Sequence, residues 1–390
     1  FEIQNYVYPE DSAHLRNFAA LALPVMSLFE ELFGHYPFKD EKFGQAEFGW
    51  GGGMEHQTMT FLGRGAFNHE IIAHELAHQW FGDAVTCGSW HDIWLNEGFA
   101  TYSAGITYEH FSPQLYWPKW KYQNQSYVTM KPDGKVFCDD TTSVDRIFDS
   151  RLSYSKGALV LHMLRWIVGD EHFYAGIRSY FNDPGSHFEF ARTKDFKHHM
   201  EMECGYSLDW FFNDWIYSEG YPSYSLHCTQ SPGGNAAVRI DQATSHPSVS
   251  FFKLPVPVYF YGNSRDTVIT FQHEFSGQVF NIEPGFVIDS IRIDPERWII
   301  SAGNTVTISQ PQGKYLTISP NPAHDLVAVF YNPDYEEDIA IVGMDGRRYE
   351  TIYNAHYPGW AILDVKALPQ GSYLLYIGKG KQTGKFLIAR

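Results

Sequence analysis

The sequence predicts a multidomain α+β protein in which a mainly helical region, residues 1–222, is followed by two small all-β regions, residues 223–302 and 303–390. Three observations lead to this prediction. The chain has 390 residues, enough for two to three domains of about 150 residues each. Apolar residues recur at helical spacing before Pro222. After it come short segments rich in β-branched and aromatic residues, separated by turn residues.

Helical patterns dominate the first region. Apolar residues recur at helical spacing in four segments, and a glycine directly follows three of them, as is typical of helix C-termini. These segments are 17–33, 69–81, 93–111 and 156–168, and a further helical stretch covers 193–217. Residues 112–153 show no such pattern and are expected to form a loop, and Gly220-Tyr221-Pro222 ends the helical region.

The second and third regions are expected to consist of short strands. In the second region these are 237–240, 256–261, 267–271, 278–282 and 290–293. A linker rich in Ser, Gly, Asn, Gln and Pro lies near 301–313. The clearest strands beyond it are 326–331, 338–343, 361–365 and 372–378. With weaker candidates, the third region would hold roughly seven strands, which favours a small sandwich.

Composition and charge exclude several classes of protein. Hydrophobic residues make up 44% of the chain and charged residues 19%, which excludes a largely disordered protein. The formal net charge is −16, with the acidic excess mainly in residues 1–222, so we expect no nucleic-acid partner. No apolar run reaches the roughly 20 residues of a membrane-spanning helix, so we expect no integral membrane segment.

The strongest functional signal is the segment His74-Glu75-Leu76-Ala77-His78. Residues four apart lie on one face of a helix, so His74 and His78 can both direct an imidazole at one metal ion. Glu75 lies beside them, placed to act on a water molecule rather than to bind the metal. The alternative is that both histidines are ordinary core residues.

Two imidazoles leave a catalytic zinc site one protein ligand short. Glu97, in an Asn-Glu-Gly context, offers a carboxylate after 18 intervening residues, a gap that suits a turn and a returning helix. A third histidine in the pattern His-x-x-Gly-x-x-His is excluded, because Phe81 and Ala84 occupy the required positions. We therefore expect one Zn²⁺ ion bound by His74, His78 and Glu97.

These motifs resemble those of the gluzincin aminopeptidases of the aminopeptidase N type, a family that also includes leukotriene hydrolase. Besides the metal-ligand pattern with WLNEGFATY around Glu97, the resemblance rests on GGGMEH at 51–56, YSKGA at 154–158, and LDWFF at 208–212 through GYP at 220–222. It covers roughly residues 1–222 and extends more weakly into 223–302. It implies a mainly helical, thermolysin-like zinc peptidase domain that removes N-terminal residues from peptides.

The resemblance assigns roles to two catalytic residues. Glu75 would accept a proton from the attacking water and deliver it to the leaving amine. Tyr154 would donate a hydrogen bond to the carbonyl oxygen as it becomes an oxyanion. The alternative for Tyr154 is one more core tyrosine among the 25 of the chain.

The loop around Glu55 would make the enzyme an aminopeptidase. A carboxylate at the end of the groove can pair with the α-ammonium group of a substrate and fix which peptide bond is cleaved. Gly52, Gly53 and Met54 complete the expected substrate-binding loop, since glycines let a substrate backbone approach closely. The alternative is a flexible loop with a solvated Glu55. His56 departs from the asparagine usual in the family, a change we expect to be tolerated.

Other residues near the motif receive structural interpretations. Trp80, Phe81, Trp90 and Trp94 are expected in the core. His69, Glu70 and His91 are open candidates for partners of the zinc-binding imidazoles.

The resemblance also has a gap. Family members begin with a large β-domain that caps the site and helps to bind the amine, whereas here the catalytic pattern starts almost at once. The chain begins at Phe1 without a recognisable signal peptide. Either the sequence is part of a longer protein or the cap has been lost. The pairing of the four cysteines, Cys87, Cys138, Cys204 and Cys228, also stays open.

The third region resembles the C-terminal sorting domain of type IX secretion substrates of Bacteroidetes. The resemblance rests on ISPNPAH at 318–324, LPQGSY at 368–373 and GKFLI at 384–388. It implies a secretion machinery as partner and a secreted or surface-attached protein. The alternative is an ordinary terminal β-sandwich, for instance a carbohydrate-binding module.

Three functions are compatible with these observations. The leading one is a zinc aminopeptidase whose partners are peptide substrates with free N-termini. The second is a related zinc hydrolase or endopeptidase without strict N-terminal specificity, made plausible by the absent cap. The third is a non-catalytic surface binding module with a relic metal site.

Overall fold

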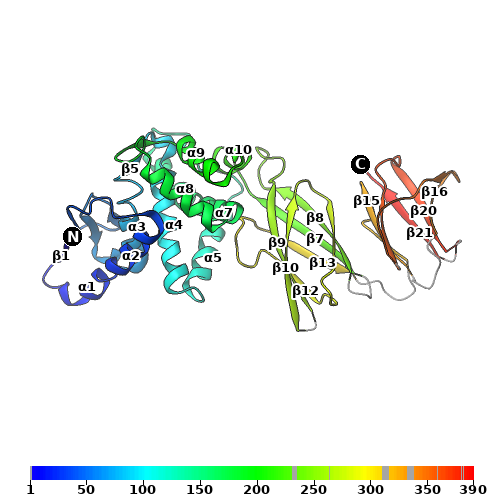
Figure 1. Cartoon of the computed structure of the whole chain (residues 1–390), viewed down its shortest axis with the longest axis horizontal. Coiled ribbons are helices and arrows are strands. Elements are labelled where there is room, and N and C mark those ends of the chain that lie inside the picture. Colours follow the sequence, from blue (N-terminus) through cyan, green and yellow to red (C-terminus); the bar gives the residue numbers. More distant parts are fainter. Residues whose placement is uncertain are drawn as a thin grey trace. The chain divides into compact units, whose positions relative to one another are not determined.

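The computed structural model describes residues 2–230, 235–262, 264–309, 316–331, 338–357, 359–378, 380 and 382–390. The fold is mixed α/β and divides into two compact units (Figure 1). Unit 1 comprises Phe1–Tyr221, Thr244–Phe252 and Glu296–Ser301. Unit 2 comprises Pro222–Ala243, Lys253–Pro295 and Ala302–Arg390. The division of the chain at 222/223 and 302/303 remains a prediction, and residues 310–313 of the expected linker lie outside the described residues.

Unit 1 begins with a small sheet whose edge borders the site. Its strand order is β1-β2-β4-β3, with β1 (Glu2–Tyr6), β2 (Lys42–Phe48) and β4 (Thr60–Gly63) parallel and β3 (Gly53–Met54) antiparallel to β4. The helices α1 (Ser12–Ala19) and α2 (Ala22–Phe33) connect β1 to β2. The sequence pattern predicted one helix over 17–33. The structure instead ends α1 at Ala19 and starts α2 at Ala22, which places Pro24 in a first turn, where a missing N–H costs nothing.

The helices that follow form the body of unit 1 (Figure 1). They are α3 (His69–Ala77), α4 (Trp94–Phe111), α5 (Tyr116–Thr129), α6 (Val144–Ile147), a π-helical segment (Ser150–Lys156), α7 (Gly157–Val168), α8 (Asp170–Asn182), α9 (Thr193–Cys204), α10 (Asp209–Phe212) and a second π-helical segment (Asn213–Tyr217). Two short strands, β5 (Val85–Cys87) and β6 (Glu189–Ala191), pair in parallel, and 3-10 turns occur at Arg64–Ala66 and Trp90–Asp92. The helices expected at 69–81, 93–111 and 156–168 are confirmed in position, with ends shifted by a few residues.

The expectation of a loop over 112–153 is wrong, because this range contains α5, α6 and the start of the π-helical segment. The buried positions of α5 have helical spacing, but two of them are polar: Lys121 and Gln125. Lys121 donates to the carbonyl oxygen of Glu296, and Gln125 donates to the carbonyl oxygens of Ile299 and Ser301. A search for apolar periodicity misses a helix whose buried face is partly polar.

Helix α4 is the centre of unit 1 and is buried on nearly every side. Aromatic rings pack around it: Phe99 stacks on Phe81 at 4.5 Å between centroids and meets Phe196 edge-on at 5.0 Å. Where α4 crosses α7, Gly98 and Gly157 meet backbone to backbone, so that a Cβ atom on Gly98 would lie 3.1 Å from the Gly157 Cα. The two glycines therefore set how closely these helices approach.

The described part of unit 2 consists of strands arranged in two pairs of sheets (Figure 1). The first pair has the orders β10-β9-β12 and β11-β8-β7-β13. Its strands are β7 (Pro222–Gln230), β8 (Ala236–Thr244), β9 (Leu254–Gly262), β10 (Arg265–His273), β11 (Gln278–Ile282), β12 (Ser290–Ile293) and β13 (Thr305–Ser309). All five strands expected in this region are confirmed.

The second pair has the orders β14-β15-β19-β18 and β17-β16-β20-β21. Its strands are β14 (Thr317–Ser319), β15 (Leu326–Phe330), β16 (Ile339–Gly343), β17 (Arg348–Tyr349), β18 (Ile352–Tyr357), β19 (Trp360–Asp364), β20 (Gly371–Ile377) and β21 (Gln382–Ile388). Both sheets contribute side chains to one buried cluster, as in a sandwich. Its members include Val327, Leu363, Ile341, Leu375 and Phe386. The four strands expected most clearly here are confirmed.

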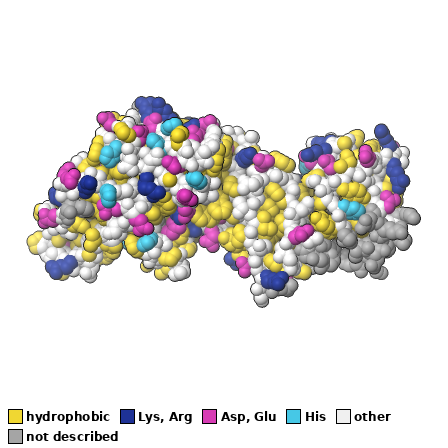
Figure 2. Space-filling model, viewed as in Figure 1, with side chains coloured by type: hydrophobic (Ala, Val, Ile, Leu, Met, Phe, Trp, Pro, Cys, Tyr) yellow, Lys and Arg dark blue, Asp and Glu magenta, His cyan; other side chains and the backbone are white. Residues whose placement is uncertain are grey.

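The surface of unit 1 carries both signs of charge. On the face drawn in Figure 2, acidic, basic and histidine side chains are interspersed and form no large patch of one sign. Among the residues that the structure describes, none of the helices combines the length and the apolar character required to cross a bilayer.

Candidate metal and active site

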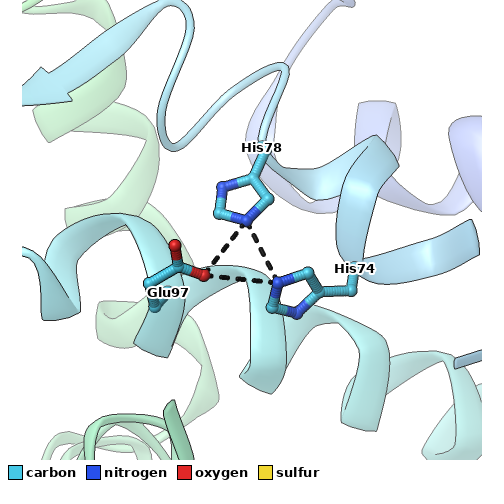
Figure 3. A group of neighbouring side chains, drawn as sticks. All are labelled: His74, His78 and Glu97. Atoms are coloured by element: carbon cyan, nitrogen blue, oxygen red, sulfur yellow. Dashed lines mark hydrogen bonds and ion pairs between the residues drawn. The ribbon is translucent and has the colours of Figure 1, made fainter. Parts of the chain in front are cut away.

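Three side chains converge at the junction of α3 and α4 (Figure 3). Asn68 caps α3 by accepting the N–H of Ile71 at 3.1 Å, and the helix carries His74 in its last turn and His78 at its C-cap. Glu97 lies in the first turn of α4. One carboxylate oxygen of Glu97 lies 3.4 Å from Nε2 of His74 and 3.3 Å from Nε2 of His78, and the two Nε2 atoms are 3.1 Å apart.

This triangle of ligand atoms is close to the size expected for tetrahedral zinc. Tetrahedral zinc with bonds of roughly 2.0–2.1 Å separates its ligand atoms by about 3.3–3.4 Å. The three separations found here are 3.1, 3.3 and 3.4 Å. Two imidazole nitrogens and one carboxylate oxygen are also a donor set found in catalytic zinc sites, with a fourth position left for water or substrate. The residues therefore fit a zinc ion.

Contacts on the far side of each imidazole fix its orientation. Nδ1 of His78 lies 3.0 Å from the carbonyl oxygen of Phe81, which can only accept. Nδ1 must then carry the proton, which leaves the lone pair of Nε2 directed at the metal position. Nδ1 of His74 lies 3.5 Å from Oγ1 of Thr101 on α4.

The sequence offered three candidates for hydrogen-bond partners of the imidazoles of His74 and His78, and all three have other contacts. His69 lies 2.7 Å from the hydroxyl of Thr107, Glu70 accepts from Tyr108, and His91 contacts the carbonyl oxygen of Cys138.

The electrostatics of the site favour a positive charge at this point. Burial alone would lower the pKa of His78, but the charge and hydrogen bond of Glu97, together with Glu55 and Glu75, outweigh burial and raise it to about 10. Burial alone would raise the pKa of Glu97, yet His78 and His74 hold it well below its ordinary value. Both shifts have one cause, the grouping of carboxylates around two imidazoles, and a divalent cation satisfies the same carboxylates.

Glu75 lies beside the triad and points toward the edge strand β3. Its side chain is 5% exposed, and burial is the main reason why its pKa is raised above the ordinary value. A carboxylate and an imidazole nitrogen approach it, because ligand atoms of Glu55, Glu75 and His78 all lie within 4.8 Å of one another. Gly53 leaves the room that Glu75 occupies, since a Cβ atom there would lie 2.5 Å from the carboxyl carbon of Glu75.

Tyr154 comes from the π-helical segment Ser150–Lys156, on the other side of His74. Its ring stacks on the imidazole of His74, with centroids 5.9 Å apart and planes 12° apart. Burial, followed by the charge of Glu97 and a hydrogen bond to it, raises the pKa of Tyr154 above its ordinary value, so the hydroxyl keeps its proton. The segment leads directly into Gly157, so the contact between Gly98 and Gly157 also sets the spacing of Glu97 and Tyr154.

The loop that carries Glu55 runs along the site from the edge of the first sheet. Gly53 and Met54 form β3, which pairs with Leu62 and Phe61 of β4. Glu55 follows directly and is half-buried. Gly52 does not line either cavity described below. Its carbonyl oxygen accepts the N–H of Gly63 at 2.8 Å, and its positive φ of 80° suits glycine.

Two cavities meet at the triad. The larger, of about 870 Å³, contains all the metal ligands with Glu55, Glu75 and Tyr154. Its outer wall is largely apolar and includes Cys87, Trp90, Ile93, Phe148 and Phe190. The smaller, of about 500 Å³, shares Gly53, His74, Glu75 and Tyr154 with the first. Most of its remaining wall residues have polar side chains: Asn68, Glu70, Ile71, Thr101, Ala104, Asn124, Tyr127, Ser150 and Ser155. The site is therefore open on both sides of the metal position.

Sequence reasoning missed part of this lining. Trp80, Phe81 and Trp94 are buried as expected, but Trp90 is 51% exposed and lines the larger cavity, so its assignment to the core is wrong. Phe148 and Phe190 were not singled out, because neither stands in a motif. Trp90 follows the turn residues Gly88 and Ser89, a position that can signal an exposed ring.

Comparisons with known proteins agree with this geometry. Residues 25–215 match the sequence model of the peptidase family M1 domain. The chain is 35% identical over 162 residues to probable aminopeptidase 1 of Saccharolobus solfataricus, a match that covers 39% of this chain and 20% of that protein. It is 31% identical over 222 residues to aminopeptidase A of Gloydius brevicauda, covering 53% and 22%. It is 29% identical over 270 residues to the mitochondrial aminopeptidase 2 of Saccharomyces cerevisiae, covering 62% and 27%.

The matches thus cover between 20% and 27% of the length of these relatives. The matched region contains the metal triad, Glu55, Glu75 and Tyr154. Residues 25–215 are thus similar to the peptidase family M1 domain, and the relatives that match this region are named aminopeptidases.

Proposed function

We propose that the protein is a zinc-dependent aminopeptidase that removes the N-terminal residue from peptides with a free amine. Its helical region would act as a thermolysin-like catalytic domain. One observation carries the proposal: the carboxylate of Glu55 lies in the same cavity as the zinc triad and within 4.8 Å of ligand atoms of Glu75 and His78. A negative charge so close to the metal position can bind an α-ammonium group and place the first peptide bond at the metal.

The residues of the site can be given distinct chemical roles. When bound by His74, His78 and Glu97, zinc supplies Lewis-acid chemistry, which acidifies water and polarises a carbonyl group. Glu75 accepts the proton of the attacking water, and its burial, which raises its pKa, favours holding that proton until the amine leaves. Tyr154 keeps its hydroxyl proton and donates it in a hydrogen bond to the developing oxyanion.

The two cavities suggest how a peptide lies in the site. With its amine on Glu55, the first residue occupies the larger cavity, where Trp90, Phe148 and Phe190 offer apolar surface to its side chain. The rest of the peptide leaves through the smaller, more polar cavity on the other side of Tyr154. An apolar first residue is therefore expected to bind better than a charged one.

The alternatives are less well supported. An endopeptidase has no use for a carboxylate that closes the amine end of the site. A relic binding module would not be expected to keep a complete ligand set, a base and a hydroxyl donor around one point.

Hydrolysis of amino-acyl amides, with free or N-acetylated amines, tests the proposal. Charge-assisted hydrogen bonds contribute roughly 1.5–3 kcal/mol, so the free amine should be preferred by about ten- to a hundredfold in kcat/KM. A zinc chelator, or His78→Ala, should abolish both activity and stoichiometric zinc. Equal kcat/KM for free and acetylated substrates would favour the endopeptidase, and zinc-loaded protein without hydrolysis would favour the binding module.

We also propose that residues 303–390 form a sorting domain recognised by a type IX secretion machinery, so that the protein is secreted or attached to the cell surface. The support is the sequence resemblance of this region and the fact that none of the candidate site residues belongs to it. Deletion of residues 314–390 should block export in a host with that machinery and leave peptidase activity intact. Export of the truncated protein would refute the sorting role.

A further inference from the structure

Gln79, the residue directly after the metal ligand His78, bonds to the loop that carries Glu55. Its side chain is fully buried. Its Nε2 lies 3.3 Å from the carbonyl oxygen of Glu55 and 3.4 Å from that of His56, and its Oε1 accepts the backbone N–H of Thr58 at 2.8 Å. One amide therefore contacts three backbone groups of residues 55–58.

Further contacts leave no part of this amide without a partner. Nε2 also donates to Oδ2 of Asp83 at 2.8 Å, and Oε1 lies 3.4 Å from the hydroxyl of Tyr36. Both donors and both acceptor positions of the amide are thus used in a buried place. A side chain without both a donor and an acceptor would leave buried backbone groups of the loop unpaired.

The loop itself adopts a conformation that has to be held. Thr58 has a φ of 61°, in the left-handed region that β-branched residues avoid. Such residues persist only where their surroundings fix them. Here Gln79 holds the N–H of Thr58, and Nζ of Lys42 donates to its carbonyl oxygen at 3.0 Å. The turn is closed by the N–H of Met59, which donates to His56.

We propose that Gln79 is a positioning residue that fixes the distance between Glu55 and the metal ligands, and so sets the preference for a free amine. The inference rests on the proposed aminopeptidase function. Gln79 and His78 are neighbours at the end of α3. The same helix end therefore positions the metal ligand His78 and, through Gln79, the loop that carries Glu55. An amine bound by Glu55 is then held at a fixed distance from the metal, which is what selects the first peptide bond.

The test compares Gln79→Met, which loses every hydrogen bond, with Gln79→Glu, which keeps the acceptor for Thr58 but loses the amide donor to the carbonyl oxygens of Glu55 and His56. Gln125→Met is the matched control, because Gln125 is also a buried amide that tethers backbone, at Ile299 and Ser301, and does not line either cavity in the described structure. For each full-length protein, kcat/KM is measured for one peptide with a free or an acetylated amine, together with zinc content and Tm.

Both Gln79 variants should keep stoichiometric zinc and the wild-type kcat/KM for the acetylated peptide. Their kcat/KM for the free peptide should fall by about tenfold, mainly through KM, because a tether of weak hydrogen bonds is lost. Gln125→Met should lower Tm without changing the preference. Wild-type preference in a zinc-loaded Gln79 variant, or an equal loss for both peptides, would overturn the inference. A wild type without any preference would instead overturn the proposed function, the premise of the inference.

Discussion

Gly53→Ala should displace the carboxylate of Glu75, the proposed base, and leave His74, His78 and Glu97 in place. A Cβ atom at position 53 would lie 2.5 Å from Cδ and 2.7 Å from Cγ of Glu75, whereas ordinary contacts begin at 3.4 Å. The carboxyl group must therefore retreat by about 0.9 Å. A misplacement of about 1 Å can cost on the order of a hundredfold in rate. We expect kcat to fall by about that factor, with zinc content and Tm close to wild type.

The assay is steady-state hydrolysis of a free-amine peptide, with zinc measured in the same preparation. Gly51→Ala is the matched control in the same loop, because a Cβ atom there would meet nothing within 4 Å. It should leave kcat unchanged. Wild-type kcat in zinc-loaded Gly53→Ala protein would mean that the position of Glu75 does not limit the reaction, and would refute its role as the base.

Three further perturbations test other parts of the site. Tyr154→Phe should lower kcat by roughly a hundredfold or more with little change in KM, since one oxyanion donor is lost; a change confined to KM would argue against that role. Gly98→Ala should force α4 and α7 apart, because its Cβ would lie 3.1 Å from the Gly157 backbone, and should cost about 1–3 kcal/mol in urea unfolding; unchanged stability would contradict the close crossing. Burial lowers the pKa of Lys156 to about 7 in the folded protein. The unfolded chain therefore binds more protons than the folded protein between about pH 7 and 10. The free energy of unfolding of the wild type should rise with pH in that range, by at most about 1.4 kcal/mol per pH unit. Lys156→Met should lack this contribution when the two proteins are unfolded by urea at pH 7 and pH 10, and equal slopes would contradict it.

The strands of unit 2 show how far local pattern predicts a fold. Gln278–Ile282 and Ser290–Ile293 match the expected strands residue for residue, because alternation and flanking turn residues specify a half-buried strand locally. Helix α5 was missed for the opposite reason. Its buried Lys121 and Gln125 satisfy carbonyl groups of residues 296–301, about 175 positions away, and no local pattern contains that information.

The candidate site shows the same division. The spacing of His74 and His78 on one helix, with a carboxylate on the next, was sufficient to predict that these three side chains come together as a possible metal site. The assignment of Trp90 to the core is wrong because its ring lines a cavity together with Phe148 and Phe190. These two residues are distant from Trp90 in sequence, so the local pattern around Trp90 does not reveal its exposure. No role was predicted for Gln79, since nothing in the sequence reveals that its amide forms hydrogen bonds to the loop that carries Glu55.

Residue types and motifs in the sequence were sufficient to name the side chains of the candidate site: the imidazoles of His74 and His78, the carboxylates of Glu55, Glu75 and Glu97, and the hydroxyl of Tyr154. The metal triad was expected from residue types at spacings that one helix and its neighbour fix, whereas Glu55 and Tyr154 were expected from the resemblance to the gluzincin aminopeptidases. The distances between these side chains are set by the three-dimensional fold. The room for Glu75 beside Gly53, the contact of Gly98 with Gly157 and the bonds of Gln79 to the loop all join segments far apart in the chain. Such contacts depend on packing of the whole unit, so no local segment of the sequence specifies them.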